Sequence, residues 1–264
     1  MDAKDIYILY RLNEIVQYLE ELAPLNYQES YDNCGLLIGD KNSVISSAVV
    51  CLDCTEEVID EAMACGANLV IAHHPLIFSG LKKITGETYI ERAVAKAIKN
   101  DVAVYAIHTN LDNVKHGVNA KICELLQLKN TQVLAPKRGV TDVGSGMVGE
   151  LVEEIDTLSF LNQIKSTFGA GSLRYTTILK GTVKRIAVCG GSGSFLLPDA
   201  IEAGADVFVS SDFKYHQFFD AENQIVIADI GHFEAEKFTK ELIYDFLREK
   251  FPTFVVRLSH IKTN

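Results

Sequence analysis

The sequence predicts an α/β protein built from two similar, interlinked lobes with mainly parallel sheets. Apolar strand-like runs alternate with helical patterns along most of the chain, as they do where crossover helices connect parallel strands. A segment of the first half, residues 64–74, resembles a segment of the second half, residues 202–212. Four of the seven histidines fall where a predicted strand ends. These three observations together favour paired α/β lobes whose polar side chains gather at the ends of the strands.

The first half of the chain reads as strand and helix in alternation. Thr55 is the expected N-cap of one helix, and Gly66 ends it before an apolar run that closes on two histidines. The expected helices cover residues 4–22, 56–65, 89–100 and 118–126. The expected strands cover the apolar end of 31–39, then 44–54, 68–72 and 102–107. This order predicts a parallel α/β lobe.

The second half repeats the rhythm after a segment rich in turn-forming residues. Residues 129–146 contain Pro136, Gly139, Gly144 and Gly146, which mark the expected boundary. The expected strands cover 147–152, 173–179, 185–189, 205–210 and 224–229, and the expected helices 157–167, 196–203, a stretch from 214, and 233–250. We therefore predict a first lobe of residues 1–128, to which residues 232–264 return, and a second lobe of residues 129–231.

The similarity between the two halves has two interpretations. In residues 64–74 and in residues 202–212, Gly-Ala and an amide or acid precede an apolar strand that ends in polar side chains. The next strand then ends in histidine in both halves, at His108 and at His232. Helix-glycine-strand units are common in α/β proteins, so convergence competes with duplication. If duplication is correct, the two lobes face each other and share one cleft.

Composition excludes several classes of protein. The chain has 264 residues, 48% of them apolar and 23% charged, which is ordinary for a globular protein able to bury a core. The formal net charge of −10 argues against a nucleic-acid surface, which needs clustered Lys and Arg. No apolar run approaches the roughly 20 residues of a membrane helix, and the first residues lack the pattern of a signal peptide. Six cysteines scattered in apolar runs suit buried thiols in a reducing compartment, so a cytoplasmic location is expected.

The histidines at the strand ends indicate a metal site. His73 and His74 close one strand, and His108 closes the next, with Asp112 four residues further on. His232 and Glu236 are four residues apart at the start of a helix, so their side chains share one helical face. A single histidine at a strand end is more often a structural hydrogen-bonding residue. Five ligand-type residues in such positions favour metal binding.

Adjacent histidines favour two ions over one. Successive side chains of a strand point in opposite directions, so His73 and His74 are expected to serve different ions, about 3.5–4 Å apart. The carboxylate of Glu236 has two oxygens and can bridge such a pair. The ligand set has no thiolate and is rich in imidazole, which disfavours structural zinc, calcium and a purely magnesium site. Zinc, iron, manganese and nickel stay open.

Other motifs are weaker. Cys51 and Cys54 fit a CxxC pattern but lie in an apolar strand, which favours buried structural cysteines. The glycine-rich residues 190–193 follow a strand and either cradle a phosphate or form a plain tight turn. Asp212, Lys214 and His216 follow the matching strand of the second half, where they either line the cleft or cap the next helix.

Five ordered motifs resemble the GTP cyclohydrolase type 2-like family, also called the NGG-interacting-factor-like family. They are Tyr31-Asp-Asn-Cys-Gly-Leu, His73-His-Pro-Leu-Ile-Phe78, His108-Thr-Asn-Leu-Asp112, Ser211-Asp-Phe-Lys-Tyr-His216 and Gly231-His-Phe-Glu-Ala-Glu236. The resemblance spans nearly the whole chain. It implies a short-form member without the extra mid-chain domain of longer members, and a toroidal homohexamer whose metal centres open toward an internal cavity. Two departures are an arginine that the family often has where this chain reads 144–148, and a valine where it has Cys34.

The resemblance also implies a dinuclear centre held by His73, His74, Asp112, His232 and Glu236. Our leading expectation is a metal-dependent hydrolase in which two divalent ions activate water toward a nucleotide-type substrate. His108 is then expected to orient a ligand or carry a proton, and His216 and Asp212 to contact substrate. The family name points to GTP, although the sequence shows no purine-specific motif. The alternative is a metal-binding, metal-delivering or regulatory protein without turnover.

Overall fold

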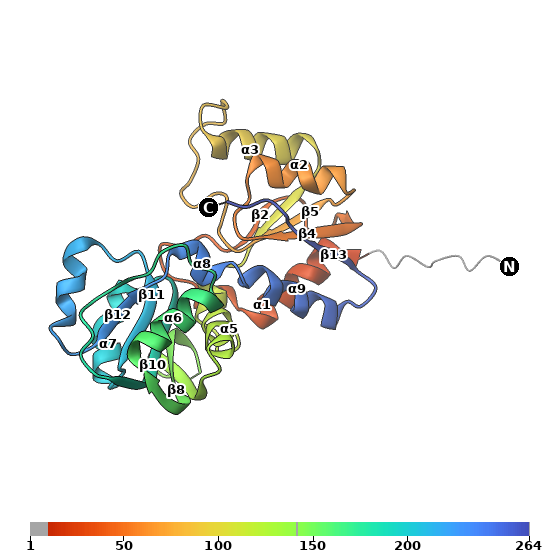
Figure 1. The fold of residues 1–264 in the computed structure, drawn as a ribbon. Helices are drawn as coiled ribbons and strands as arrows, with labels where there is room; N and C mark the ends of the chain where they lie inside the picture. The colour runs from red at the N-terminus through yellow and green to blue at the C-terminus, as the bar shows by residue number, and fades with distance from the viewer. Residues whose placement is uncertain (1–9, 141, 264) are drawn as a thin grey trace. The chain divides into compact units, whose positions relative to one another are not determined.

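The computed structural model describes residues 10–140 and 142–263, and the chain divides into two compact units (Figure 1). Unit 1 comprises residues 1–111 and 239–264, and unit 2 comprises residues 112–238. The α/β class expected from the sequence is confirmed. The chain passes between the units at 111/112 and 238/239, whereas the sequence suggested boundaries at 128/129 and 231/232. The first difference arises because the helix α5 (Val118–Leu125) packs on the sheet of unit 2.

Unit 1 is built on a five-stranded, mainly parallel sheet. Its strands are β2 (Gly35–Ile38), β4 (Ser47–Cys51), β5 (Leu69–Ala72), β6 (Ala103–Ala106) and β13 (Val255–Leu258). The order is β13-β4-β5-β6-β2, and only β2 is antiparallel to its neighbour. Every residue of β4, β5 and β6 is buried, as expected for parallel strands covered on both faces. The expected strand 44–54 is divided into β3 (Val44–Ile45) and β4.

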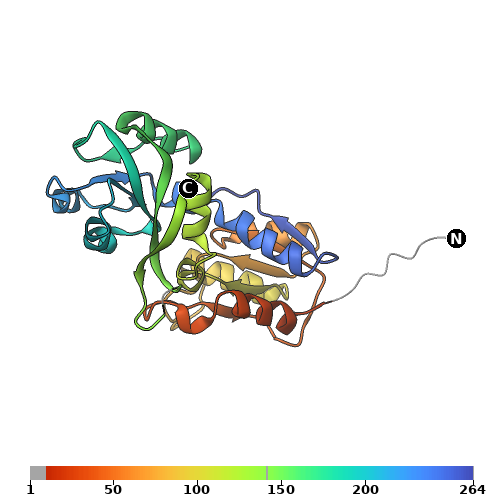
Figure 2. The same ribbon diagram turned by 90° about the horizontal axis from the view of Figure 1, so that it is seen from below.

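Helices cover both faces of this sheet. Helices α2 (Glu56–Ala64) and α3 (Tyr89–Lys99) lie on one face, while α1 (Leu12–Leu22) and α9 (Thr239–Lys250) lie together on the other, as the view from below shows (Figure 2). Thr55 is the N-cap of α2 as predicted, because its side chain accepts a hydrogen bond from the Val58 amide. Within the helix expected at 4–22, the apolar positions Leu12, Ile15, Val16 and Leu19 have helical spacing and are buried in α1. Residues 4–9 of the expected helix, which include Ile8, lie outside the described residues. The short elements of this unit are β1 (Tyr10–Arg11) and η1 (Leu25–Tyr27).

Unit 2 has a six-stranded mixed sheet. Its strands are β7 (Lys129–Pro136), β8 (Gly144–Asp156), β9 (Arg174–Tyr175), β10 (Thr182–Ser192), β11 (Val207–Ser211) and β12 (Val226–Asp229), in the order β7-β8-β10-β11-β12-β9. The central trio β10-β11-β12 is parallel, and the other pairings are antiparallel. The turn-rich residues 129–146 thus form a hairpin, whose connection contains Gly139. The expected turn at 190–193 is mostly a continuation of β10.

Apart from α6 (Thr157–Thr167), the helices of unit 2 are short. Besides α5 they are η2 (Ser194–Leu196), α7 (Leu197–Glu202), η3 (Tyr215–Ala221) and α8 (His232–Glu236). One apolar core cluster joins η2, α7 and η3 to the central strands. The last helix expected from the sequence, 233–250, is interrupted where the chain leaves unit 2 after α8 and enters unit 1 at α9.

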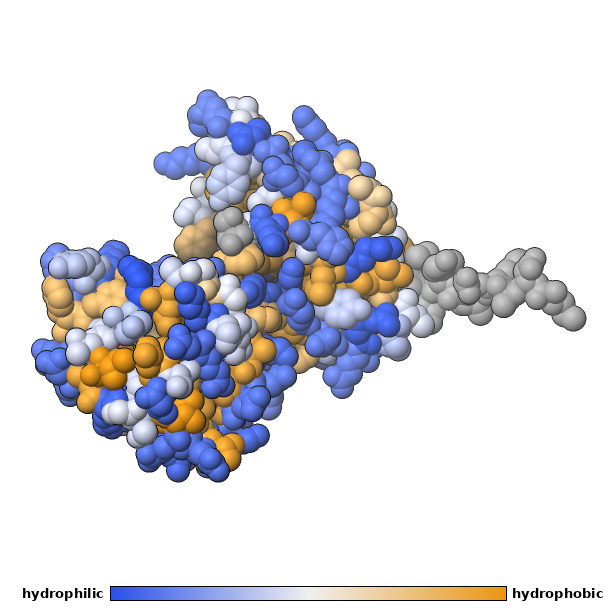
Figure 3. Space-filling model, in the orientation of Figure 1, coloured by the Kyte–Doolittle hydropathy of each residue, from blue (hydrophilic) through white to orange (hydrophobic). Residues whose placement is uncertain are grey.

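The surface of unit 2 is not uniformly polar. The face seen in Figure 3 shows apolar side chains among polar ones near α7 and β8. The large apolar residues that are exposed in this unit include Val152, Leu158 and Phe195.

In the part of the chain that the structure describes, every helix is too short or too polar to span a bilayer.

Candidate metal centre

Three histidines of unit 1 form one cluster. His73 and His74 follow β5, and His108 follows β6, so the two neighbouring parallel strands deliver them to the same edge of the sheet. The ring centroids of His73 and His74 are 4.9 Å apart, and each lies 5.2 Å from the ring of His108. One ring nitrogen from each residue lies within 4.8 Å of the other two. This spacing suits imidazoles that hold a metal ion.

The protein fixes His73 and His74 through one ring nitrogen each. The side chain of His73 is fully buried, and its Nδ1 lies 2.9 Å from the carbonyl oxygen of Ile107. A carbonyl can only accept, so Nδ1 carries the proton and Nε2 carries the lone pair. The Nδ1 of His74 lies 2.7 Å from a carboxylate oxygen of Asp53. Both rings therefore have the orientation and tautomer of metal-ligating histidines.

Asp53 is itself held in place by the end of the chain. Its second carboxylate oxygen accepts a 2.5 Å hydrogen bond from the hydroxyl of Thr263. Burial by itself raises the pKa of Asp53, but the hydrogen bonds from His74 and Thr263 and the charge of His74 outweigh it and lower the pKa. The carboxylate is therefore ionised at neutral pH and accepts from the His74 ring.

A second carboxylate anchors His108. The Nδ1 of His108 lies 2.9 Å from one oxygen of Asp32, and the other oxygen accepts from the hydroxyl and amide of Thr109. Cys34, at the position where the family often has valine, adds a contact of 3.1 Å from its sulfur to Asp32. Burial raises the pKa of the Cys34 thiol to about 12, so it stays protonated and donates. Burial alone raises the pKa of Asp32, but the His108, Thr109 and Cys34 contacts hold it well below its usual range.

Replacing Asp32 by asparagine is expected to destabilise the protein by about 2–3 kcal/mol at pH 7, the usual contribution of a buried charged hydrogen bond. Because the folded-state pKa of Asp32 is depressed, its stabilisation is present above the unfolded-state pKa of about 3.9 and is lost as pH falls below it. Urea unfolding at pH 7 and pH 3 measures the difference from the natural protein, which should shrink at pH 3.

The matched control for this prediction is Asp60→Asn. Asp60 forms an exposed ion pair with Lys96 at 2.7 Å, and such pairs contribute about 0–1 kcal/mol. An Asp32→Asn variant that unfolds like the Asp60→Asn variant at pH 7 would show that the Asp32 network contributes nothing particular to stability.

Unit 2 contains an imidazole and a buried carboxylate on one helix. In α8 the Nε2 of His232 lies 2.9 Å from an oxygen of Glu236, whose side chain is only 2% exposed. The Nδ1 of His232 lies 2.7 Å from Asp212, which also accepts from the hydroxyl of Ser192. Burial acts to raise the pKa of Asp212, and the hydrogen bonds of Ser192 and His232 lower it overall. His232 is therefore fixed by a carboxylate in the same way as His74 and His108.

The glycine-rich end of β10 makes room for this pair. Gly191 has a φ of +61°, and a Cβ placed there would lie 2.4 Å from Glu236 Oε1 and 3.2 Å from His232 Cε1. A Cβ on Gly190 would lie 2.9 Å from the side chain of Val118 in α5. Gly191 thus lets α8 pack closely against the strand, and Gly190 does the same for α5, a use that differs from both sequence interpretations of residues 190–193.

Asp112 is positioned at the end of α4 (Thr109–Asp112). Its carbonyl oxygen accepts a 3.0 Å hydrogen bond from the amide of Asn119 in α5. The side-chain oxygen of Asn119 in turn accepts from the backbone amide of Gly190 at 2.9 Å. Asn119 therefore ties Asp112 to the strand on which Glu236 packs.

The amino-acid sequence and the fold both match proteins of one family. The model of the family described as DUF34/NIF3 (NGG1p interacting factor 3) matches residues 10–264. The chain belongs to the DUF34/NIF3 family. A relative from Clostridium perfringens, named "GTP cyclohydrolase 1 type 2 homolog", is 40% identical over 227 residues, which are 86% of this chain and 87% of the relative.

Solved structures of similar proteins share this fold. Staphylococcus aureus protein SA1388 has a TM-score of 0.88 at 28% identity, covering 97% of this chain and 98% of that chain. A Bacillus cereus protein related to NIF3 has the same TM-score at 26% identity, with the same coverage of both chains. The family resemblance seen in the motifs is therefore confirmed.

In this DUF34/NIF3 chain, the structure brings several of the predicted residues together within each unit. His73, His74 and His108 meet in unit 1, and Asp112, His232 and Glu236 belong to unit 2. His216 is exposed on η3, where its ring packs against Tyr215 and Phe219 at centroid distances of 5.1 and 5.9 Å. Cys51 and Cys54 are buried as expected, and burial raises the pKa of both thiols.

No signal in the sequence identifies the residues that orient the histidines and Asp112. Asp53 ends a strand region as polar residues often do, but its distance of 21 residues from His74 gives no signal. Asp32 lies 76 residues from His108. In the sequence, Asp32 is part of one family motif, but nothing there indicates that it orients a histidine. Asn119 shows no pattern that separates it from other polar helix residues.

Proposed function

We propose that this chain is a dinuclear metal-dependent hydrolase whose ligands are His73, His74, Asp112, His232 and Glu236. The observation that carries the proposal is shared by His73, His74, His108 and His232. In each, Nδ1 lies 2.7–2.9 Å from a carbonyl or carboxylate oxygen, which leaves Nε2 as the ligand atom; the Nε2 of His232 lies 2.9 Å from Glu236, a second proposed ligand. This is the arrangement that metal-ligating histidines adopt. The ligand chemistry fits zinc, iron, manganese or nickel.

Chain connectivity supports combining ligands from the two units. Asp112 is the first residue of unit 2 and is joined to His108 of unit 1 through the single helix α4. Glu236 closes α8, just before the chain returns to unit 1 at Thr239. Two of the proposed ligands, Asp112 and Glu236, thus lie in the chain next to the two points where it passes from one unit to the other. A buried carboxylate at the second crossing suits a bridging ligand.

The side chains have distinct roles in this proposal. Two bound ions would supply Lewis-acid chemistry and lower the pKa of water toward neutrality. Asp53 and Asp212 hold His74 and His232 in the tautomer that a cation requires. His108 lies in the same cluster as His73 and His74 but outside the proposed ligand set, and its ring is fixed by the ionised Asp32. It is therefore placed to accept and return a proton during hydrolysis.

The substrate proposal rests on the relatives. Several are named "GTP cyclohydrolase 1 type 2 homolog", which supports a nucleotide-type substrate. The toroidal homohexamer implied by the family motifs belongs to the same proposal, as does a cytoplasmic location. His216 and Asp212 are proposed to contact the substrate.

Metal content and turnover test the function together. Protein purified without chelators is expected to contain about two divalent ions per chain by elemental analysis. It is expected to hydrolyse at least one member of a nucleotide and phosphoester panel, to lose activity on dialysis against EDTA, and to regain it when metal is restored. Well under two ions per chain contradicts the dinuclear centre. Full metal content without turnover on any panel member favours a metal-binding or metal-delivering protein.

A further inference from the structure

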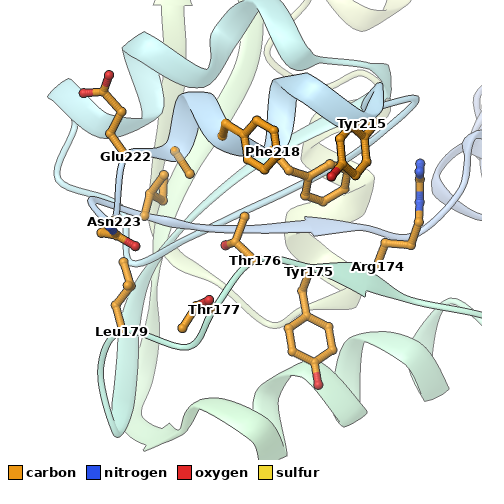
Figure 4. Close-up of a pocket in the computed structure, with 12 residues that line it drawn as sticks. Arg174, Tyr175, Thr176, Thr177, Leu179, Tyr215, Phe218, Glu222 and Asn223 are labelled. Atoms are coloured by element: carbon orange, nitrogen blue, oxygen red, sulfur yellow. The ribbon is translucent and has the colours of Figure 1, made fainter.

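Unit 2 contains a pocket of about 580 Å³ that includes none of the proposed metal ligands. It lies between η3 on one side and β9 with the residues that follow it on the other (Figure 4). Its lining is mostly apolar or aromatic and includes Arg174, Tyr215, Phe218, Phe219, Glu222 and Asn223. Sites for small molecules have volumes of about 300–1,000 Å³ and mostly apolar or aromatic walls with a few polar groups. This pocket has both properties.

The aromatic side of the pocket is formed by η3. Tyr215 and Phe219 are 73% and 60% exposed, although large aromatic side chains are usually covered. Tyr215 packs edge-on against Phe219 at 5.3 Å, and Phe218, which also lines the pocket, packs against the buried Phe213 at 5.6 Å. Exposed aromatic rings around one hollow offer surfaces on which a flat ring can stack.

Polar groups lie at the two ends of the pocket. Arg174 stands at one end and Asn223 at the other, as Figure 4 shows. One terminal nitrogen of Arg174 donates to Asp229 and to the carbonyl of Phe213, and its guanidinium lies 5.4 Å from the centre of the Phe218 ring. Within the described residues its other two nitrogens make no hydrogen bond. They remain as oriented donors at the edge of the aromatic surface.

The charge of the pocket selects against phosphate. Asp229, which is 4% exposed, neutralises Arg174, and Glu222 adds a negative charge to the lining. Phosphate sites instead combine unpaired Arg or Lys with helix N-termini, and η3 is only a short 3₁₀ helix. The charges therefore favour an uncharged ligand with a hydrogen-bond acceptor facing Arg174.

We propose that this pocket binds an uncharged aromatic heterocycle of the nucleobase kind. The ring stacks on the aromatic side chains of η3, one acceptor edge meets the donors of Arg174, and the opposite edge meets the amide of Asn223. This binding goes beyond the proposed hydrolysis and does not depend on metal, since no proposed ligand lines the pocket.

Titration of the full-length protein with adenosine, guanosine and uridine tests the proposal. Isothermal calorimetry and ligand-observed NMR are expected to detect binding of at least one nucleoside, and its 5′-monophosphate is expected to bind no more tightly. Phe219→Ala should weaken binding by about tenfold or more, because it removes a stacking surface. Arg174→Lys should also weaken it, because the charge is kept while the planar donor pair is lost.

Phe195→Ala is the matched control. Phe195 is 62% exposed in the same unit but does not line the pocket, so its removal should leave nucleoside affinity unchanged. The proposal is overturned if no nucleoside binds at millimolar concentration, or if the monophosphates bind tenfold tighter than the nucleosides. Equal losses in the Phe195→Ala and Phe219→Ala variants also overturn it. So does light scattering in which Phe219→Ala breaks an oligomer while nucleoside affinity is unchanged, since the aromatic surface would then be a contact between copies.

Discussion

Replacing Glu236 by glutamine is expected to weaken metal binding by at least about 100-fold and to abolish the associated hydrolysis. The buried carboxylate is the proposed bridge between two divalent ions, and its negative charge would attract both. Glutamine keeps the size of the side chain and can still contact His232, so the fold should persist. Competition with a chromogenic chelator measures the affinity, and elemental analysis measures how many ions remain.

Glu234→Gln is the control on the same helix. Glu234 lies in the first turn of α8 and is only partly buried, so the same change of charge should leave metal content and turnover intact. Urea unfolding of both metal-free variants separates a folding defect from a binding defect. Full metal content in the Glu236→Gln protein would remove Glu236 from the ligand set.

Replacing Gly191 by alanine is expected to disrupt the metal site more than the fold. The new Cβ would stand 2.4 Å from Glu236 Oε1, the mobile end of a flexible side chain, so the carboxylate can move aside. Its displacement relieves the clash but moves the two oxygens, which are proposed to bridge the ions, away from His232. We expect metal affinity to fall by at least tenfold, measured by the same chelator competition, with loss of turnover.

Gly204→Ala makes this experiment selective. Gly204 has a φ of +69°, close to the +61° of Gly191, but a Cβ there meets no atom within 4 Å. Both substitutions should therefore cost about 1–2 kcal/mol of stability from the left-handed backbone, and only one should affect metal. Equal metal affinity in the two variants would mean that Gly191 serves only the local backbone.

The sequence was informative where a local pattern reports burial. The apolar runs that became β5 and β6 are buried on both faces, and such strands can be recognised before the fold is known. Their ends then place His73, His74 and His108 at one edge of the sheet. Thr55 shows the same principle for a helix start, because a cap acts on the amide three residues later.

The sequence was less informative where the outcome depends on which surfaces meet. The apolar side of α5 does not indicate which sheet the helix covers. For this reason the sequence predicted a boundary after residue 128, whereas the structure has it after residue 111. The residues between α8 and α9 favour helix, so the sequence gives no signal of the interruption between the two helices. Glycine is needed at position 191 because α8 packs on β10 there. The residues next to Gly191 in the chain do not indicate this contact.

Because protein oxygens already fix the four imidazoles, folding of this chain does not have to wait for metal. In small zinc-binding domains the ions assemble their own ligands, and their binding energy is the folding energy. Here Asp32, Asp53 and Asp212 do that ordering in advance, with two units that bury cores of their own. If the proposed centre binds ions, they would be lost, exchanged or acquired late without loss of the fold. The ion found in such a chain would then reflect the metals available around it.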